Sequence, residues 1–311
     1  MKVDIPDSDG RTPLMLACSH NMKKCVKWLL DNGADPNIKD KPYGRTSIHW
    51  AARLGCPDAL KLLLDKDDSA AVINARDNTG RTPLHLAALG GSDECVELLV
   101  DRNADVDSVD SKGMTPMFLA SAKGFTKCIK HLLGVGANYT IRSTKSKSLP
   151  IHAASLGGFE STVNLLSRLI YSENEFKNGN LHSPVHCAAA GGNDKCLDML
   201  LMQKVGNATD KDSNGLTPLH IAAFKGNAEC LQSLLEEAPE TADAKDNRGE
   251  TPLFKAIAAG SAECIEILVD AGANLAVKDN MGRTVAHAAA AFGDASILEY
   301  IIDKLGPECL E

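Results

Sequence analysis

Short apolar stretches recur along the chain with the spacing of one face of an α-helix. In DECVELLV, residues 93–100, the apolar residues Cys95, Val96, Leu98 and Leu99 fall on one side when the segment is helical. Near copies of this stretch place a cysteine in the same position at Cys25, Cys128, Cys196, Cys230 and Cys264. The pattern predicts a series of short amphipathic helices, each with one buried side.

Each of these helices follows a second repeated stretch, of which GRTPLHLAA at residues 80–88 is the clearest copy. A Thr before Pro suits a helix N-cap, because its side-chain oxygen accepts a backbone N–H that lacks a partner inside the helix, and Pro fits the first helical position. Nine residues after the cap, eight copies have Gly and one has Asn21; both residue types tolerate the left-handed conformation at a helix end. The cap position falls at Thr12, Thr46, Thr82, Thr115, Leu149, Ser183, Thr217, Thr251 and Thr284, with spacings of 33 to 36 residues.

The segments between successive copies have the composition of extended loops. Stretches such as NGADPNIKD (residues 32–40) end a second helix, and Asp-x-x-Gly sequences such as DNTG (residues 77–80) suit tight turns. Each copy is therefore predicted to contain a helix, a turn, a second helix and an extended finger. One such unit cannot bury its own apolar face, so neighbouring units are expected to stack into a solenoid.

A period near 33 residues with the core T-P-L-H-x-A resembles the ankyrin-repeat family over the whole chain. The resemblance implies an all-α fold, an ankyrin-repeat solenoid of about nine helix-turn-helix units joined by hairpin-like fingers. We expect residues 1–311 to form a single array. Solenoid ends normally carry polar capping repeats, and the first and last copies here look like ordinary internal ones, so we also expect the chain to be part of a longer protein.

Composition and charge narrow the function classes. Hydrophobic residues make up 44% of the chain but aromatic residues only 4%, so small aliphatic side chains must fill the core. The formal net charge of −8 argues against a general nucleic-acid binder. No run approaches the roughly 18 apolar residues that cross a bilayer, so direct membrane insertion is not expected. The cysteines lack disulfide spacing, which favours a cytoplasmic location, with a nuclear one also open.

The repeated cysteines allow four interpretations: a disulfide ladder, a metal array, a reactive thiol or a structural position. Packed helices stand about 8–10 Å apart, whereas a disulfide needs Cα atoms within about 4.4–6.8 Å, so we interpret these cysteines as small apolar core residues. Cys56, in a turn, and Cys309, near the terminus, are instead expected to be exposed and reactive. No cofactor is predicted.

A histidine three residues after the cap is the second repeated chemical group. In the ankyrin family this histidine bonds the cap hydroxyl and nearby backbone, and the resemblance implies the same role here. Zinc would need ligands converging at about 2.0–2.1 Å, which one histidine per layer does not supply, so no metal site is predicted. The histidines in this position are His49, His85, His152, His186, His220 and His287.

Surface positions that differ between copies are candidates for binding. In the ankyrin family the finger tips and the exposed side of the first helices form a concave recognition face, and the resemblance implies that face here. Arg and large apolar side chains are the usual anchors of protein interfaces. The alternative is a solvated face with scattered apolar residues. The candidates just before the caps and late in the first helices are Arg11, Arg45, Arg53, Leu54, Arg81, Leu89, Met114, Lys123, Phe224 and Lys225.

The middle of the array departs from the pattern. In the fifth and sixth copies Lys147 and Leu181 replace the turn glycine, and Thr144 and Asn178 replace the turn aspartate. We interpret this region as a contact for an acidic or phosphorylated partner segment, and the alternative is an irregular, solvated pair of fingers. The basic cluster that supports the first interpretation is Lys127, Lys130, Arg142, Lys145 and Lys147.

The sequence also predicts one modification. Asn37, in the stretch LLDNGADPN, occupies the finger position that asparaginyl hydroxylases modify in some ankyrin proteins. The resemblance therefore implies a modification site at Asn37, with Pro36 in place of the usual aliphatic neighbour.

Together these patterns predict a non-enzymatic scaffold or adaptor that binds another protein or a peptide segment. The alternative is a regulatory or targeting array of a larger assembly. Residues 183–235 are similar to units in the long regulatory ankyrin subunits of protein phosphatase 6, and the repeat pattern as a whole also resembles the ankyrin arrays of TRP-type ion channels.

Overall fold

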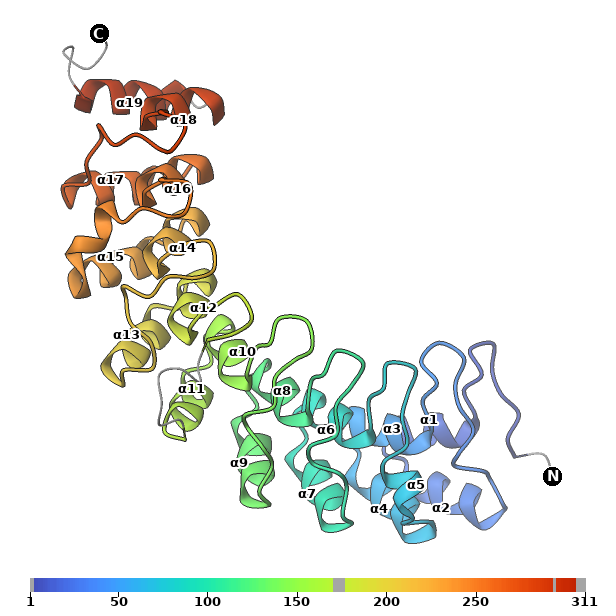
Figure 1. Cartoon of the computed structure of the whole chain (residues 1–311). Coiled ribbons are helices and arrows are strands. Elements are labelled where there is room, and N and C mark those ends of the chain that lie inside the picture. The colour runs from blue at the N-terminus through green and yellow to red at the C-terminus, as the bar shows by residue number, and fades with distance from the viewer. Residues whose placement is uncertain (1–2, 170–176, 293–294, 306–311) are drawn as a thin grey trace. The chain divides into compact units, whose positions relative to one another are not determined.

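The computed structural model describes residues 3–169, 177–292 and 295–305. Within these ranges the secondary structure is helical, with nine helix pairs and no strand (Figure 1). The predicted all-α fold is thus confirmed. Contacts divide the chain into two compact units, Met1–Pro150 and Ile151–Glu311.

The first unit contains four helix pairs. Its first helices contact one another in the order α1, α3, α6, α8, and its second helices in the order α2, α4, α7, α9. A short extra helix, α5 (Ala70–Ile73), follows α4. The pairs are α1 (Pro13–Ser19) with α2 (Lys23–Asp31), α3 (Ser47–Arg53) with α4 (Pro57–Lys66), α6 (Pro83–Gly90) with α7 (Asp93–Asp101), and α8 (Pro116–Ser121) with α9 (Thr126–Gly134).

The second unit stacks in the same way. Its first helices contact one another in the order α12, α14, α16, α18, and its second helices in the order α11, α13, α15, α17. A 3-10 helix, η2 (Pro239–Asp243), follows α15. The pairs are α10 (Pro150–Leu156), which begins at the boundary, with α11 (Glu160–Ser167), α12 (Pro184–Gly191) with α13 (Asp194–Met202), α14 (Pro218–Lys225) with α15 (Ala228–Glu237), α16 (Pro252–Ala259) with α17 (Ala262–Asp270), and α18 (Val285–Phe292) with α19 (Ala295–Leu305).

The repeated sequence produces the helix boundaries as predicted. Thr82 is an N-cap in extended conformation, Pro83 follows at the start of α6, and the Thr82 side chain accepts the backbone N–H of His85. The helix ends at Gly91, whose φ of 75° is left-handed. Asn21, the exception to glycine at this position, has a φ of 52° and takes the same conformation. Gly293 in the last copy lies outside the described residues.

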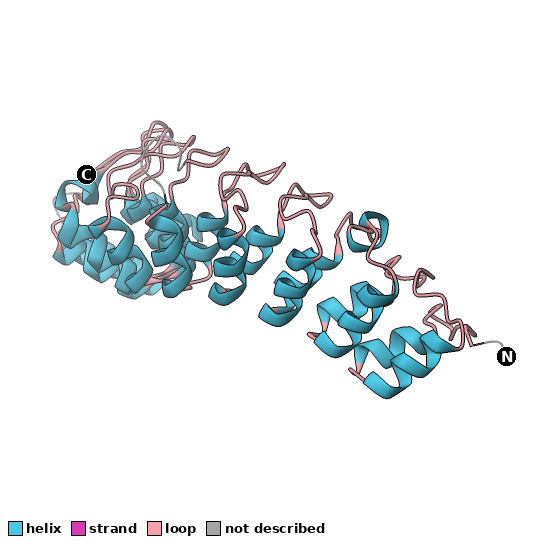
Figure 2. Ribbon diagram, turned by 90° about the horizontal axis from the view of Figure 1, so that it is seen from below, coloured by secondary structure: helices cyan, strands magenta, loops and turns pink. Residues whose placement is uncertain are grey.

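The fingers project along one edge of the helix pairs in each unit (Figure 2). A typical tip is a hairpin-like turn, in which Gly80 N–H donates to Asp77 O at 2.9 Å and Asp77 N–H donates to Arg81 O at 2.9 Å. Because the turn closes on itself through the backbone, it keeps its form in copies whose side chains differ.

Burial confirms the core position for five of the six repeated cysteines. Cys95, Cys128, Cys196, Cys230 and Cys264 are each at most 1% exposed, and burial raises the pKa of the Cys95 thiol to about 11. All nine described cysteines are free thiols. The repeated cysteines therefore fill space in the second-helix layer.

Two cysteine predictions are wrong. Cys25 is exposed. The repeated position faces the preceding helix pair, as shown by the distance of 4.0 Å between Cys230 Sγ and Ala188 O. Because α2 has no preceding pair among the described residues, nothing there covers Cys25. Cys56 is only 5% exposed, since its thiol turns back toward Ser19 O at 3.6 Å. Cys309 lies outside the described residues.

Candidate functional site

The first helices and the fingers of each unit form one continuous face, which we call the finger face. Its turn carboxylates hold the fingers in shape from within. Asp77 is 6% exposed, and its Oδ1 accepts the backbone N–H groups of Thr79 at 2.8 Å and Arg81 at 3.0 Å. In the second unit Asp246 accepts those of Arg248 at 2.8 Å and Glu250 at 2.9 Å in the same way.

Backbone hydrogen bonds also join the tips of successive fingers. In the first unit Ser111 N–H donates to Thr79 O at 2.9 Å. In the second unit Asn247 N–H donates to Asn214 O at 2.9 Å, and Asn280 N–H donates to Arg248 O at 2.9 Å. One such bond per step makes the finger face a preformed surface, so a ligand would order little of it on binding.

Five of the six repeated histidines join one repeat to the next, which confirms their predicted structural role, and the sixth, His287, is exposed and bonds its own cap residue Thr284. His85 Nδ1 accepts the backbone N–H of Thr82 at 3.2 Å, and its Nε2–H donates to Met114 O in the following repeat at 2.9 Å. His220 makes the equivalent bonds to Thr217 N at 3.1 Å and Glu250 O at 3.1 Å. This pattern requires a neutral imidazole protonated at Nε2. Burial lowers the pKa of His85 and of His220 to about 4, so both rings are neutral near pH 7.

The second oxygen of several turn carboxylates binds a side chain from the preceding repeat. Arg45 Nε lies 3.3 Å from Asp77 Oδ2, and Arg81 Nε lies 3.1 Å from Asp110 Oδ2. Arg45 is only 6% exposed and its guanidinium stacks 4.4 Å above the Tyr43 ring. Two of the arginines selected as binding candidates are thus built into the scaffold.

The other candidates of the first unit lie at or near the surface. Leu54 is 50% exposed and caps α3, and Lys123, just after α8, is also exposed. Arg53, Leu89 and Met114 are partly buried. Arg11 pairs with Asp7 at 2.9 Å and with Asp9 at 3.1 Å.

The finger of the fifth repeat carries part of the predicted basic cluster. Arg142 Nη1–H donates to Lys147 O at 2.8 Å, so this guanidinium closes the turn, while Lys145 and Lys147 are exposed at the tip. Lys147 has a φ of 53°, which confirms that it stands in the glycine position. The turn-aspartate position is taken by Ser143, whose Oγ accepts Ser148 N–H at 3.1 Å, so its assignment to Thr144 was wrong. The remaining cluster members, Lys127 and Lys130, are exposed on α9.

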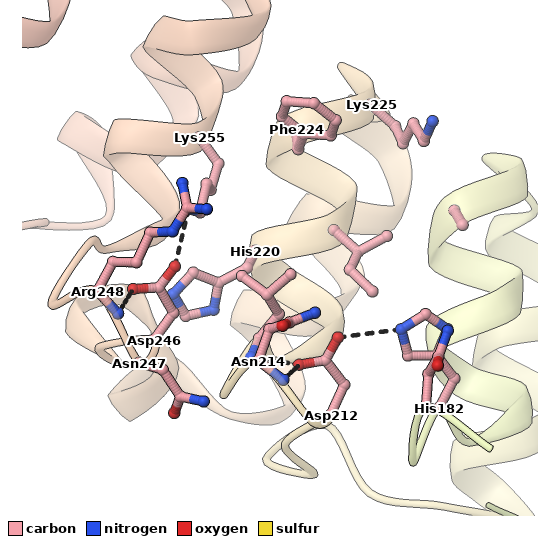
Figure 3. Close-up of a pocket in the computed structure, with 14 residues that line it drawn as sticks. His182, Asp212, Asn214, His220, Phe224, Lys225, Asp246, Asn247, Arg248 and Lys255 are labelled. Carbon is pink, nitrogen blue, oxygen red and sulfur yellow. Dashed lines mark hydrogen bonds and ion pairs between the residues drawn. The ribbon is translucent and has the colours of Figure 1, made fainter. Parts of the chain in front are cut away.

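A groove on the finger face of the second unit lies across α12, α14 and the first turn of α16 (Figure 3). It has a volume of about 540 Å³. Phe224 and Lys225, at the end of α14, line it, and Phe224 is 53% exposed. A second groove of about 280 Å³ shares Phe224 and Arg248 and extends to Phe292, which is 59% exposed. Phe224 and Lys225 are among the residues that the sequence predicted for this face.

Three basic residues that line the groove, His182, Arg248 and Lys255, were not predicted from the sequence. His182 Nε2 lies 3.0 Å from Asp212 Oδ2, in the place where other repeats have an Arg–Asp pair. Lys255, from α16, lies 2.8 Å from Asp246 Oδ2. Arg248 is an exposed finger-tip residue between the two grooves. The signal that could have found them is the loss of Arg before the caps of these repeats.

Asn37 is exposed on its finger, and its backbone N–H donates to Asp35 Oδ1 at 2.9 Å. Its side chain is therefore accessible from solvent.

Among the residues that the structure describes, no group of three or more His, Cys, Asp or Glu side chains is arranged to hold a metal ion. In the same part of the chain, none of the helices has the length and apolar character that a bilayer crossing requires.

The stacked helix pairs, the histidine network and the linked fingers define a repeat protein with a preformed surface. A model of the ankyrin-repeat family, described as ankyrin repeats in three copies, matches residues 1–77, 69–143, 149–243 and 238–310. The chain belongs to the ankyrin-repeat family.

Several curated proteins are similar over parts of this chain. A B-cell lymphoma 3 protein homolog of Mus musculus is 35% identical over 110 residues, which is 35% of this chain and 24% of that protein. NF-kappa-B inhibitor delta of Mus musculus is 37% identical over 79 residues, 25% of this chain and 24% of that protein. Transient receptor potential channel pyrexia of Drosophila melanogaster is 42% identical over 66 residues, 21% of this chain and 7% of that protein. This chain therefore matches a quarter or less of the length of each.

Proposed function

We propose that this protein is a non-enzymatic scaffold or adaptor that binds another protein, or a peptide segment of one, on its finger face. The observation that carries the proposal is the groove of about 540 Å³ beside the half-exposed ring of Phe224, on a surface whose fingers are already linked by backbone hydrogen bonds. Aromatic residues, phenylalanine among them, are enriched at the core of protein interfaces.

The chemistry of the repeated polar groups supports recognition rather than catalysis. The buried histidines use both ring nitrogens in structural bonds, as at His85 and His220. The buried cysteines have raised thiol pKa values, about 11 for Cys128 and about 12 for Cys230, because burial disfavours the thiolate. These groups hold the repeats together and are poorly placed to act on a substrate.

The binding residues we propose differ between the two units. In the second unit Phe224 and Lys225 take part directly. In the first unit Leu54, Leu89, Met114 and Lys123 supply contact area, while Arg11, Arg45, Arg53 and Arg81 contribute mainly by shaping the face. The exposed lysines of the fifth finger, Lys145 and Lys147, with Arg142 closing the turn, would receive an acidic or phosphorylated partner segment.

A second candidate function is that of a regulatory or targeting array within a larger assembly. The names of two relatives, an NF-kappa-B inhibitor and a transient receptor potential channel, support it, as does the small share of those proteins that this chain matches. A cytoplasmic or nuclear location and a modification at Asn37 remain part of the proposal.

Site-specific photo-crosslinking tests the proposed binding face. A photoreactive amino acid is placed at position 224, in the groove, or at position 202, where Met202 at the end of α13 is 84% exposed on the second-helix layer. After irradiation in cell extract, mass spectrometry identifies the adducts. We expect a defined set of partner proteins at position 224 that is missing at position 202. The same adducts at both positions, or none at 224, would contradict the proposal.

A further inference from the structure

The groove of the second unit contains carboxylates that are already occupied. Asp212 and Asp246 are 5% and 9% exposed. Oδ1 of Asp212 accepts the backbone N–H groups of Asn214 and Leu216, each at 2.8 Å, and its Oδ2 accepts from His182. Asp246 accepts two backbone N–H groups and Lys255 in the same manner. Both oxygens of each carboxylate are therefore already engaged within the protein.

The accessible charges of the groove are two cations. Arg248, on a finger tip, and Lys225, at the end of α14, are exposed, and within the described ranges neither forms an ion pair with a carboxylate. Lys225 Nζ lies 5.8 Å from the centre of the Phe224 ring, so the lysine and the aromatic anchor stand together. The groove therefore presents positive charge although the chain has a formal net charge of −8.

The rest of the groove suits an extended peptide. Ile221 and Phe224, on one face of α14, provide apolar surface. Asn180 and Asn214 are exposed on adjacent fingers at the rim, where their side-chain amides can pair with the backbone of a bound strand. An open groove of this kind accepts a linear segment with a side chain pointing inward.

We propose that the occupant of this groove is an extended acidic segment of a partner protein, in which a large apolar side chain packs on Phe224 and neighbouring Asp or Glu carboxylates bind Arg248 and Lys225. The inference rests on the proposed function and specifies its partner chemistry. Charge-assisted hydrogen bonds from Arg to carboxylate fix the orientation of the bound segment, and the contact with the aromatic ring supplies most of the buried area.

Selection from a random 12-residue phage-displayed peptide library tests the inference on the full chain. Selected peptides are synthesised and their affinity measured by fluorescence anisotropy against the wild type and the variants Phe224→Ala, Lys225→Glu and Arg248→Glu. Lys195→Glu is the matched control, because Lys195 is exposed on α13 and gives the same change in charge. All substituted side chains are exposed or half-exposed, and circular dichroism verifies that each variant is folded.

We expect enriched peptides that combine a large apolar residue with Asp or Glu, and a loss of affinity of about tenfold in Lys225→Glu and in Arg248→Glu but not in Lys195→Glu. Replacing by Lys the acidic residue of the peptide that binds Arg248 should restore binding to Arg248→Glu. If the peptides depend on Phe224 but are neutral or basic, this inference is overturned while protein recognition at the groove stands. If no enriched peptide depends on Phe224, recognition at the groove fails as well.

Discussion

Acidification between pH 7 and pH 5 should destabilise this protein through its buried histidines. Burial is the main cause that lowers the pKa of His49, His85, His186 and His220 from 6.5 to about 4. The unfolded chain therefore binds more protons than the folded chain at any pH between these values. The contribution of these histidines to the free energy of unfolding is fully present above about pH 6.5 and decreases as the pH falls toward 4.

The size of the effect follows from the number of protons taken up on unfolding. Between pH 6 and pH 5 an unperturbed histidine is mostly protonated, whereas one with a pKa near 4 is mostly neutral. Each histidine then contributes about 1.1 kcal/mol per pH unit, close to the limit of about 1.4 for one full proton. The first unit contains His49 and His85 and the second His186 and His220, so each unit should lose about 2 kcal/mol per pH unit.

Urea denaturation followed by circular dichroism at pH 7, 6 and 5, at constant ionic strength, measures this slope. The turn carboxylates of Asp77 and Asp246 have lowered pKa values, because the hydrogen bonds they accept outweigh their desolvation, and their stabilising effect is lost mainly near and below pH 4, outside this window. His85→Gln should be less stable at pH 7 but lose less stability on acidification, because one titrating group is gone. A slope below about 0.5 kcal/mol per pH unit would refute the neutral, buried state of these rings.

Three further predictions concern the scaffold and the basic finger. Thr82→Ala removes a cap acceptor and should cost about 1 kcal/mol in urea denaturation, with an unchanged helical spectrum at low urea. Arg45→Ala leaves the buried carboxylate of Asp77 without its cation and should cost about 3–5 kcal/mol; a loss under about 1 kcal/mol would show that water replaces the guanidinium. The double variant Lys145→Glu and Lys147→Glu should weaken a partner found by crosslinking at least fivefold in a titration, and an unchanged affinity would exclude this finger from the interface.

Much of the fold was predictable because each unit repeats the same local chemistry. Thr82, Pro83 and His85 act within four residues of one another, and their caps form in the structure as the sequence predicts. The errors arose where burial depends on a neighbour. Cys25 has the sequence environment of Cys95 but lacks a preceding helix pair among the described residues, so it is exposed.

The candidate site was less predictable, because the role of a surface arginine depends on a contact about thirty residues away. Arg45 and Arg81 occupy the same position before the cap and looked like binding anchors, yet each pairs with the turn aspartate of the next finger. Nothing within a single repeat shows that contact. It appears only when two consecutive repeats are placed side by side.

The ladder of arginine–aspartate pairs also accounts for part of the variation along the chain. Where the position before the cap is the apolar Met114, the next finger has Ser143 in place of an aspartate. A buried carboxylate without a counter-charge lowers the stability of the fold. The loss of the arginine is therefore tolerated best when the aspartate is replaced by a neutral residue as well. The residue at position 114 therefore has to match the residue at the turn-aspartate position of the next finger.

The second unit is an exception to that rule. The exception shows which charges stabilise the scaffold and which are available for binding. Leu216 stands where the ladder would have an arginine, yet Asp246 is retained, and Lys255 from α16 supplies the missing cation. The carboxylate is thus satisfied from within its own repeat, and the exposed Arg248 nearby is not needed for that purpose. Because the scaffold does not require Arg248, and Phe224 beside it is half-exposed, ligand binding is the only constraint on the residue at position 248. That is why the groove, rather than the arginine ladder, is the place to look for specificity.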